Sequence, residues 1–247
     1  MAPACCPEPS LRHTIWLRQA NLAFVYLPKV ACTSWKLFLA QALHGSLPAD
    51  LSYADVHLPK RLALPLVALM ASHEQEQFHQ GVQQGAIALV AMLREPRARI
   101  LSAYLDKIEN RPNPRSYFRT VVRPAIQAFH GLPTERIPTF LQFLQWIQAA
   151  EHPASANDHW QPMHQLLGLL PGHTQGFARL WRLDEIEEAA ISMNRWLGCD
   201  VPFPTFTALG PRPASGSRDR LEQMFADAEV QQLFEALYGA DLRLYQR

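Results

Sequence analysis

Between residues 28 and 36 the chain carries a lysine and two hydroxyl residues in a spacing that suits an anion. The segment reads Pro28-Lys29-Val30-Ala31-Cys32-Thr33-Ser34-Trp35-Lys36 and lies between a short apolar run and a helical pattern. A helix that begins after a buried strand points several N–H groups, and the positive end of its dipole, out of the sheet edge. With Lys29, Thr33 and Ser34 added, this segment predicts a site for phosphate or sulfate.

Two alternatives bear on this segment. Thr or Ser is also the ordinary N-cap of any helix, so the hydroxyls alone do not require an anion. The ATP-binding pattern GxxxxGK[ST] is absent, because the segment has no glycine and Lys29 precedes the hydroxyls. A P-loop kinase is therefore disfavoured. It would also need an acidic metal ligand at a strand end, where the second apolar run instead ends in Leu93-Arg94.

Two continuous apolar runs precede the segments that carry Lys29 and Arg94, and the strands they form must position these side chains. Residues 21–27 (NLAFVYL) and 86–93 (AIALVAML) read as strands buried in a parallel sheet. A helix should follow each strand, and the expected helices cover residues 33–44, 62–80, 97–109, 115–130, 137–150, 183–197 and 217–237. The pattern predicts an α/β fold with a small central parallel sheet flanked by helices and a mostly helical C-terminal half. We expect residues 1–20 to be a lead-in and residues 21–247 to form a single domain.

Composition and charge narrow the function classes. The chain has 247 residues, of which 48% are hydrophobic, enough for a sizeable core. The 23 Lys and Arg residues nearly balance 22 Asp and Glu, which argues against a nucleic-acid-binding protein. The sequence has no run of 18 apolar residues, so it predicts no membrane helix. The N-terminus MAPACCPEPSLRHT lacks the pattern of a signal peptide. The four cysteines match neither a disulfide framework nor a zinc site, so we expect a soluble cytoplasmic protein.

The segment around Lys29 resembles a known family. YLPKVACTSWK is similar to the 5′-phosphosulfate loop of carbohydrate sulfotransferases, in the group that contains the chondroitin, dermatan and HNK-1 enzymes. Residues 93–107 (LREPRARILSAYLDK) resemble the 3′-phosphate element of that family. Asp158-His159-Trp160-Gln161-Pro162 resembles its His-Trp segment, and residues 237–245 resemble its C-terminal ending. The four motifs occur in order, and the resemblance spans about residues 21–246. It implies a P-loop-like sulfotransferase fold.

The resemblance implies a donor and the residues that bind its 5′ side. Members of the family transfer the sulfuryl group of 3′-phosphoadenosine 5′-phosphosulfate to a hydroxyl. Carried over, Lys29 contacts the oxygen that bridges phosphate and sulfate. Backbone N–H groups and hydroxyls of Ala31, Cys32, Thr33 and Ser34 hold the 5′-phosphate. No metal is expected, because Lys and Arg supply the countercharge.

On the 3′ side, the resemblance assigns Arg94 and Ser102 to the 3′-phosphate. An Arg guanidinium suits a phosphate fork, and Ser102 lies about two helical turns further on. Trp35 is a candidate for stacking on adenine, although a tryptophan at this spacing is more typical of a core. Arg97 and Arg99 belong to a local excess of eight basic over three acidic residues in 94–123, and we interpret them as a solvated helix face.

The acceptor hydroxyl needs a base, and a histidine that titrates near neutrality suits that task. His57 lies between the two phosphate-binding segments, where several groups of sulfotransferases place their base. His159 belongs to the His-Trp segment. Both remain candidates, as does a residue of another type.

The sequence therefore predicts a sulfotransferase that uses 3′-phosphoadenosine 5′-phosphosulfate, with a sugar or glycan hydroxyl as acceptor and with no nucleic acid and no integral membrane segment. A catalytically idle nucleotide-binding or interaction protein that keeps the fold is the main alternative, and a P-loop kinase is a weaker one.

Overall fold

The computed structural model of the chain describes residues 7–52, 55–58, 60–110, 113–171, 173–204 and 217–247. The chain divides into two units, one made of Met1–Arg94 and Met163–Arg212, the other of Glu95–Pro162 and Pro213–Arg247. The first unit holds the sheet, and the described part of the second is helical. A single domain over residues 21–247 stays a prediction.

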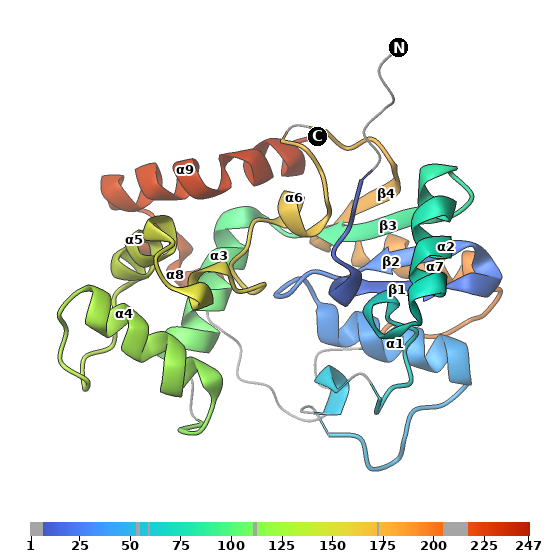
Figure 1. Cartoon of the computed structure of the whole chain (residues 1–247), viewed down its shortest axis with the longest axis horizontal. Helices are drawn as coiled ribbons and strands as arrows, with labels where there is room; N and C mark the ends of the chain where they lie inside the picture. Colours follow the sequence, from blue (N-terminus) through green and yellow to red (C-terminus); the bar gives the residue numbers. More distant parts are fainter. Residues whose placement is uncertain (1–6, 53–54, 59, 111–112, 172, 205–216) are drawn as a thin grey trace. The chain divides into compact units, whose positions relative to one another are not determined.

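The sheet has four strands in the order β1-β2-β3-β4: β1 (Thr14–Leu17), β2 (Leu22–Val25), β3 (Ala88–Leu93) and β4 (Phe177–Arg182). Strands β2, β3 and β4 are parallel, and β1 pairs with β2 in the antiparallel sense. Figure 1 shows the strands side by side in this order, with α1, α2 and α7 around them. The prediction of an α/β fold with a small, mainly parallel sheet is confirmed.

The two strands that the sequence predicts are the two central ones. All of β2 is buried, and so is all of β3 except half-buried Ala88, because each strand has neighbours on both sides and helices over its faces. Strand β1 lies within residues 1–20, where the sequence analysis predicted no strand. Its Ile15 and Leu17 are buried, and the antiparallel pairing with β2 places β1 at one edge of the sheet. Strand β4 was also missed.

The helices of the first unit are α1 (Cys32–His44), α2 (Ser72–Gln83), the short α6 (Met163–Leu166) and α7 (Ile186–Leu197). The helix expected over residues 62–80 begins only at Ser72. Pro65 lacks the N–H that a helix would need, and Leu62, Leu64 and Leu66 alternate as buried residues, the pattern of an extended segment. This segment lies against β1, where the Trp16 N–H donates to the Pro65 carbonyl at 3.0 Å.

The core of the first unit forms around Trp35 in the first turn of α1. The Trp35 side chain is fully buried, and its ring centroid lies 4.6 Å from that of Phe24 and 4.8 Å from that of Phe203. The indole Nε1–H donates to the Met92 sulfur at 3.3 Å. These contacts fix the start of α1 against β2 and β3.

The second unit contains α3 (Pro96–Tyr104), α4 (Arg123–Phe129), α5 (Phe140–Ala149), α8 (Ser217–Met224) and α9 (Ala228–Tyr245), with π-helical turns at Leu105–Glu109 and Phe118–Val122. The single helix expected over residues 217–237 is two helices. Asp227 separates them, because its side chain accepts from the Glu229 N–H at 2.8 Å and so begins α9. The Glu95 carboxylate caps α3 in the same way.

Aromatic side chains form the core of the second unit. Trp146 and Trp160 are buried with Phe143, and Tyr238 from α9 donates its hydroxyl to the Trp160 carbonyl at 2.6 Å. Among the described residues, no helix is both long enough and apolar enough to cross a bilayer.

Candidate functional site

The loop between β2 and α1 has an uncommon backbone. Lys29 (φ 69°) and Ala31 (φ 47°) both adopt the left-handed region, where a side chain is sterically disfavoured by about 1–2 kcal/mol per residue. The Val30 N–H donates to the Leu27 carbonyl at 3.2 Å and closes the turn. Strained residues of this kind persist where the surroundings hold them, and they cluster at ligand sites.

The first turn of α1 presents backbone donors to this loop. Ala31 occupies the N-cap position and makes no side-chain cap. The intrahelical hydrogen bonds begin with the Trp35 N–H, which donates to the Ala31 carbonyl at 3.0 Å, so the N–H groups of Cys32, Thr33 and Ser34 precede them. The alternative that Thr33 or Ser34 is the ordinary N-cap is wrong, because both lie inside the first turn.

Arg94, directly after β3, reaches the same loop. Its Nη1 donates to the Lys29 carbonyl at 3.0 Å. Val25 and Ala91 are partners in the parallel pair β2–β3, so the carboxyl ends of these strands, and with them Lys29 and Arg94, come to one edge of the sheet. The structure therefore brings together two residues that the sequence analysis assigned to separate phosphate groups.

The indole of Trp35 is not exposed at the candidate site. It is fully buried among Phe24, Phe38 and Phe203, and its backbone N–H bonds within the helix. The assignment of Trp35 to the adenine ring is thereby corrected in favour of the core.

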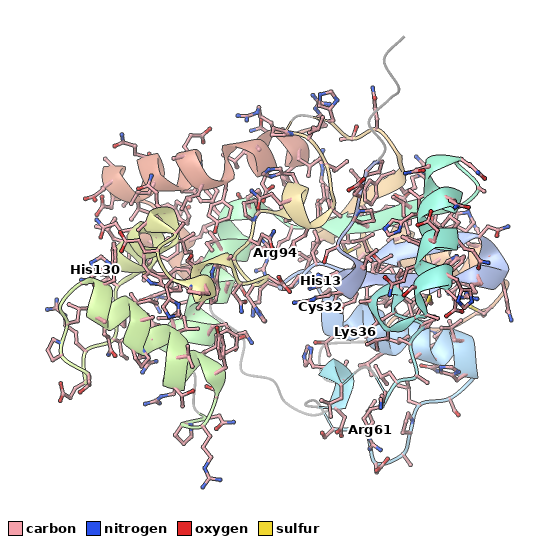
Figure 2. The ribbon with its side chains drawn as sticks, in the orientation of Figure 1. His13, Cys32, Lys36, Arg61, Arg94 and His130 are labelled. Atoms are coloured by element: carbon pink, nitrogen blue, oxygen red, sulfur yellow. The ribbon has the colours of Figure 1, made fainter. Side chains whose placement is uncertain are left out.

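Lys36, the second lysine near the loop, was not singled out by the sequence analysis. Only 7% of Lys36 is exposed, and its Nζ lies 4.2 Å from the centroid of the Tyr26 ring. Burial lowers the pKa of its ammonium group, and electrostatic interaction with Cys32 partly offsets the effect. The signal was available in the sequence, because Lys36 follows Cys32 by four residues and shares its helix face. Cys32, Lys36 and Arg94 are labelled in Figure 2.

Lys36 and His57 line one pocket of about 340 Å³ in the first unit. His57 ends a short 3₁₀ turn, Asp55–His57, and is exposed. The pocket also contacts Tyr26, which lies three residues before Lys29. His57 therefore lines the same pocket as the two residues that flank the loop, and its role as a base stays a prediction.

Ser102 and His159 belong to the second unit. Ser102 is buried in α3. The His159 Nδ1 lies 2.8 Å from the side-chain oxygen of Asn157, which also accepts the His159 backbone N–H at 3.0 Å. Because an amide oxygen only accepts, the neutral ring carries its proton on Nδ1. The functions predicted for both residues stay predictions.

Arg99 has a structural role that the sequence analysis missed. It was interpreted as part of a solvated helix face, yet only 1% of it is exposed. Its Nη1 donates to the Gln161 carbonyl at 2.8 Å and its Nη2 to the Asp158 carbonyl at 3.1 Å. Arg99 thus holds the backbone on either side of His159. Arg97, in contrast, is exposed as expected.

In the described part of the chain, no three His, Cys, Asp or Glu side chains gather as metal ligands would.

A sheet edge that carries Lys29, Arg94 and a helix N-terminus is typical of α/β proteins that bind phosphate or sulfate esters at strand ends. The chain belongs to the sulfotransferase family, whose family profile matches residues 12–246. The resemblance inferred from the motifs is confirmed.

Named relatives agree with this membership. Human carbohydrate sulfotransferase 14 is 32% identical over 208 residues, which cover 83% of this chain and 52% of the relative. Zebrafish (Danio rerio) carbohydrate sulfotransferase 11 is 22% identical over 258 residues, which cover 95% of this chain and 67% of the relative. The match therefore spans about half the length of the first of these relatives. No solved structure gives a significant match.

The contacts of Arg99 generate a stability prediction. Arg99→Met removes the donor of two carbonyl oxygens, and a hydrogen bond from a charged group contributes about 1.5–3 kcal/mol. The free energy of unfolding, measured by urea denaturation, should fall by about 3 kcal/mol or more. Arg97→Met, an exposed neighbour in the same helix, should change it by less than about 1 kcal/mol. Equal losses in the two variants would contradict the role given to Arg99.

Proposed function

We propose that this chain transfers the sulfuryl group of 3′-phosphoadenosine 5′-phosphosulfate to a hydroxyl of a carbohydrate. The observation that carries the proposal is the meeting of Lys29 and Arg94 at the start of α1, joined by the 3.0 Å hydrogen bond between the Arg94 guanidinium and the Lys29 carbonyl. The names of the relatives, all carbohydrate sulfotransferases, support a sugar acceptor. The cytoplasmic location stays a prediction from the sequence.

The donor set fits a nucleotide with two anionic ends. Lys29 supplies a positive charge, and α1 adds the N–H groups of Cys32, Thr33 and Ser34 with the positive end of its dipole. These groups would hold the 5′-phosphosulfate, with Lys29 at the bridging oxygen. Arg94 would hold the 3′-phosphate, and the part that the family resemblance gives to Ser102 stays a prediction from the sequence. The donor supplies an activated sulfuryl group when it is bound.

The loop backbone suits the chemistry that these residues perform. Sulfuryl transfer, like phosphoryl transfer, depends on positioning and on countercharge placed where negative charge develops. Because the turn at residues 28–31 is closed by its own hydrogen bond and by Arg94, the Lys29 backbone is fixed before a ligand arrives. Its ammonium group can then neutralise the charge that grows on the leaving phosphate.

His57 is the better supported base. It lines the pocket that also contacts Tyr26 and Lys36, the residues on either side of the donor loop. A neutral imidazole there would accept the proton of the attacking hydroxyl. His159, which belongs to the His-Trp segment, is the second candidate.

A nucleotide experiment tests the donor assignment. 3′-Phosphoadenosine 5′-phosphate, at a concentration about a hundredfold above its Kd, should raise the melting temperature by about 5–10 °C. ADP should raise it much less, because it lacks the 3′-phosphate that Arg94 would bind. Arg94→Met should weaken binding of the 3′-phosphorylated nucleotide about tenfold to a hundredfold, with Arg195→Met as the exposed control. Equal stabilisation by ADP in the unchanged protein would sink the assignment.

Lys29→Met should abolish most turnover while the protein stays folded. The substitution keeps the aliphatic stem and removes the charge, whose effect is greatest in the transition state. Initial rates with radiolabelled donor measure kcat and KM for the variant, and Lys60→Met serves as an exposed lysine control. A raised KM for the donor with kcat unchanged would show that Lys29 only binds.

If His57 is the base, His57→Ala should lower kcat by about a hundredfold or more and leave the nucleotide-induced melting shift intact. The same measurement on His159→Ala compares the second candidate, and His73→Ala is an exposed histidine control. Near-normal turnover in His57→Ala together with loss in His159→Ala would transfer the role to His159.

A further inference from the structure

The pocket that contains His57 has an unusual lining for a site that would hold a bare sugar. Five of its eleven lining residues are leucines, namely Leu58, Leu62, Leu64, Leu66 and Leu69. Val56 and Ala68 extend the apolar wall. None of the described residues that line it is Asp, Glu, Asn or Gln. Sugar hydroxyls would therefore find few side-chain carboxylates or amides here, whereas an apolar group would find a matching surface. We refer to this cavity as the leucine pocket.

The leucine pocket adjoins the donor loop. Its polar lining residues are Arg12, Tyr26, Lys36 and His57. Of these, Tyr26 and Lys36 lie on either side of residues 29–34 in the sequence, and we call this part of the pocket its polar end. Lys36 is one helical turn beyond Cys32, so their side chains lie about 5–6 Å apart at Cβ. Because Cys32 begins the helix turn that would hold the 5′-phosphate, a molecule in the pocket would lie within about one helix turn of a donor bound there. This is where an acceptor must be.

The polar end is already occupied by contacts within the protein. The Lys36 ammonium group lies over the Tyr26 ring, and the Tyr26 hydroxyl donates to the Arg12 carbonyl at 2.8 Å. These groups are held in place, and they leave His57 at the exposed side of the pocket, where a hydroxyl would meet it.

The leucines divide into a buried floor and an exposed rim. Leu62 is 2% exposed and Leu64 is 7% exposed, whereas Leu58 and Leu69 are 53% and 63% exposed. Rim leucines that face water in a concave site make its occupation by an apolar group favourable. The volume of about 340 Å³ lies near the lower end of the range for ligand pockets, roughly 300–1,000 Å³. It fits one ring or a short alkyl chain.

We propose that the leucine pocket binds an apolar aglycone of the acceptor, so that the substrate class is a small amphiphilic glycoside: a hydroxyl-bearing sugar joined to an alkyl chain or an aromatic ring. The proposal rests on the proposed function, because it takes the donor to be held by the loop beside the pocket. The apolar group enters between the rim leucines, and the sugar remains at the side of His57.

Binding of two matched glycosides tests the proposal. Hexyl β-glucoside and methyl β-glucoside are titrated into the full chain in the presence of 3′-phosphoadenosine 5′-phosphate, and Kd is measured by calorimetry. Each fully buried methylene tightens binding about fourfold, so partial burial of the hexyl chain should lower Kd by at least about tenfold. Equal Kd values, or no measurable binding of the hexyl glycoside, would overturn the proposal.

A variant with two substituted rim leucines tests whether the preference for the hexyl chain arises in the leucine pocket. Leu58→Gln combined with Leu69→Gln should remove most of the preference for the hexyl chain. Leu170→Gln is the matched control, because Leu170 is 51% exposed and lies outside the pocket lining; it should keep the preference. A preference that survives in the rim variant would overturn the pocket assignment, and the melting shift with nucleotide verifies that the donor loop remains folded.

The two levels of the proposal fail in different ways. A melting shift with 3′-phosphoadenosine 5′-phosphate but no hexyl preference would leave the proposed function standing and overturn the aglycone site. A hexyl preference without any selective nucleotide shift would overturn both the donor assignment and the use of the pocket for an acceptor.

Discussion

The hydrogen bond from Arg94 to the Lys29 carbonyl is the contact on which the candidate site depends. It joins the residue after β3 to the loop after β2, and it is possible because these strands are parallel neighbours whose carboxyl ends meet. A backbone carbonyl that accepts from a guanidinium is fixed in direction, and so is the peptide that follows it. The left-handed conformation of Lys29 is therefore held from outside the loop, without the glycine that such a turn usually requires.

This constraint explains how a loop proposed to bind an anion can lack the glycines of nucleotide-binding loops. In a glycine-rich loop the backbone approaches the phosphate because no Cβ stands in the way. Here Lys29 and Ala31 adopt positive φ angles although neither is a glycine. Trp35 is buried in the core and holds the following helix turn in place. The loop is consequently rigid through packing and hydrogen bonding. A site of this kind needs little ordering when its ligand binds, which favours affinity.

The sequence predicted the parts of the fold that are encoded by an unbroken run of apolar residues or by a regular helical pattern. The apolar runs of β2 and β3 and the helical pattern of α1 indicated the sheet and the loop, because burial on both faces leaves few polar residues. Strand β4 was missed since Phe177–Arg182 carries two arginines and only Trp181 is buried. The role of Arg99 could not be predicted, because an arginine in a basic stretch gives no sign that two distant carbonyls will meet it. Lys36 was visible as a helix neighbour of Cys32, but its burial depends on Tyr26 and on the pocket wall.

The segment that carries the pocket leucines also protects the sheet. Strand β1 is one of the two edge strands, and an edge strand offers unpaired backbone groups to other chains. The Pro65 carbonyl accepts the Trp16 N–H, and Leu66 forms an isolated bridge with Ile15, so the far side of β1 is covered at its centre. Residues 62–66 thus line the leucine pocket and also cover the edge of the sheet at β1. Substitutions that loosen residues 62–66 would therefore expose β1 to self-association and, if the leucine pocket binds the proposed ligand, alter that binding as well.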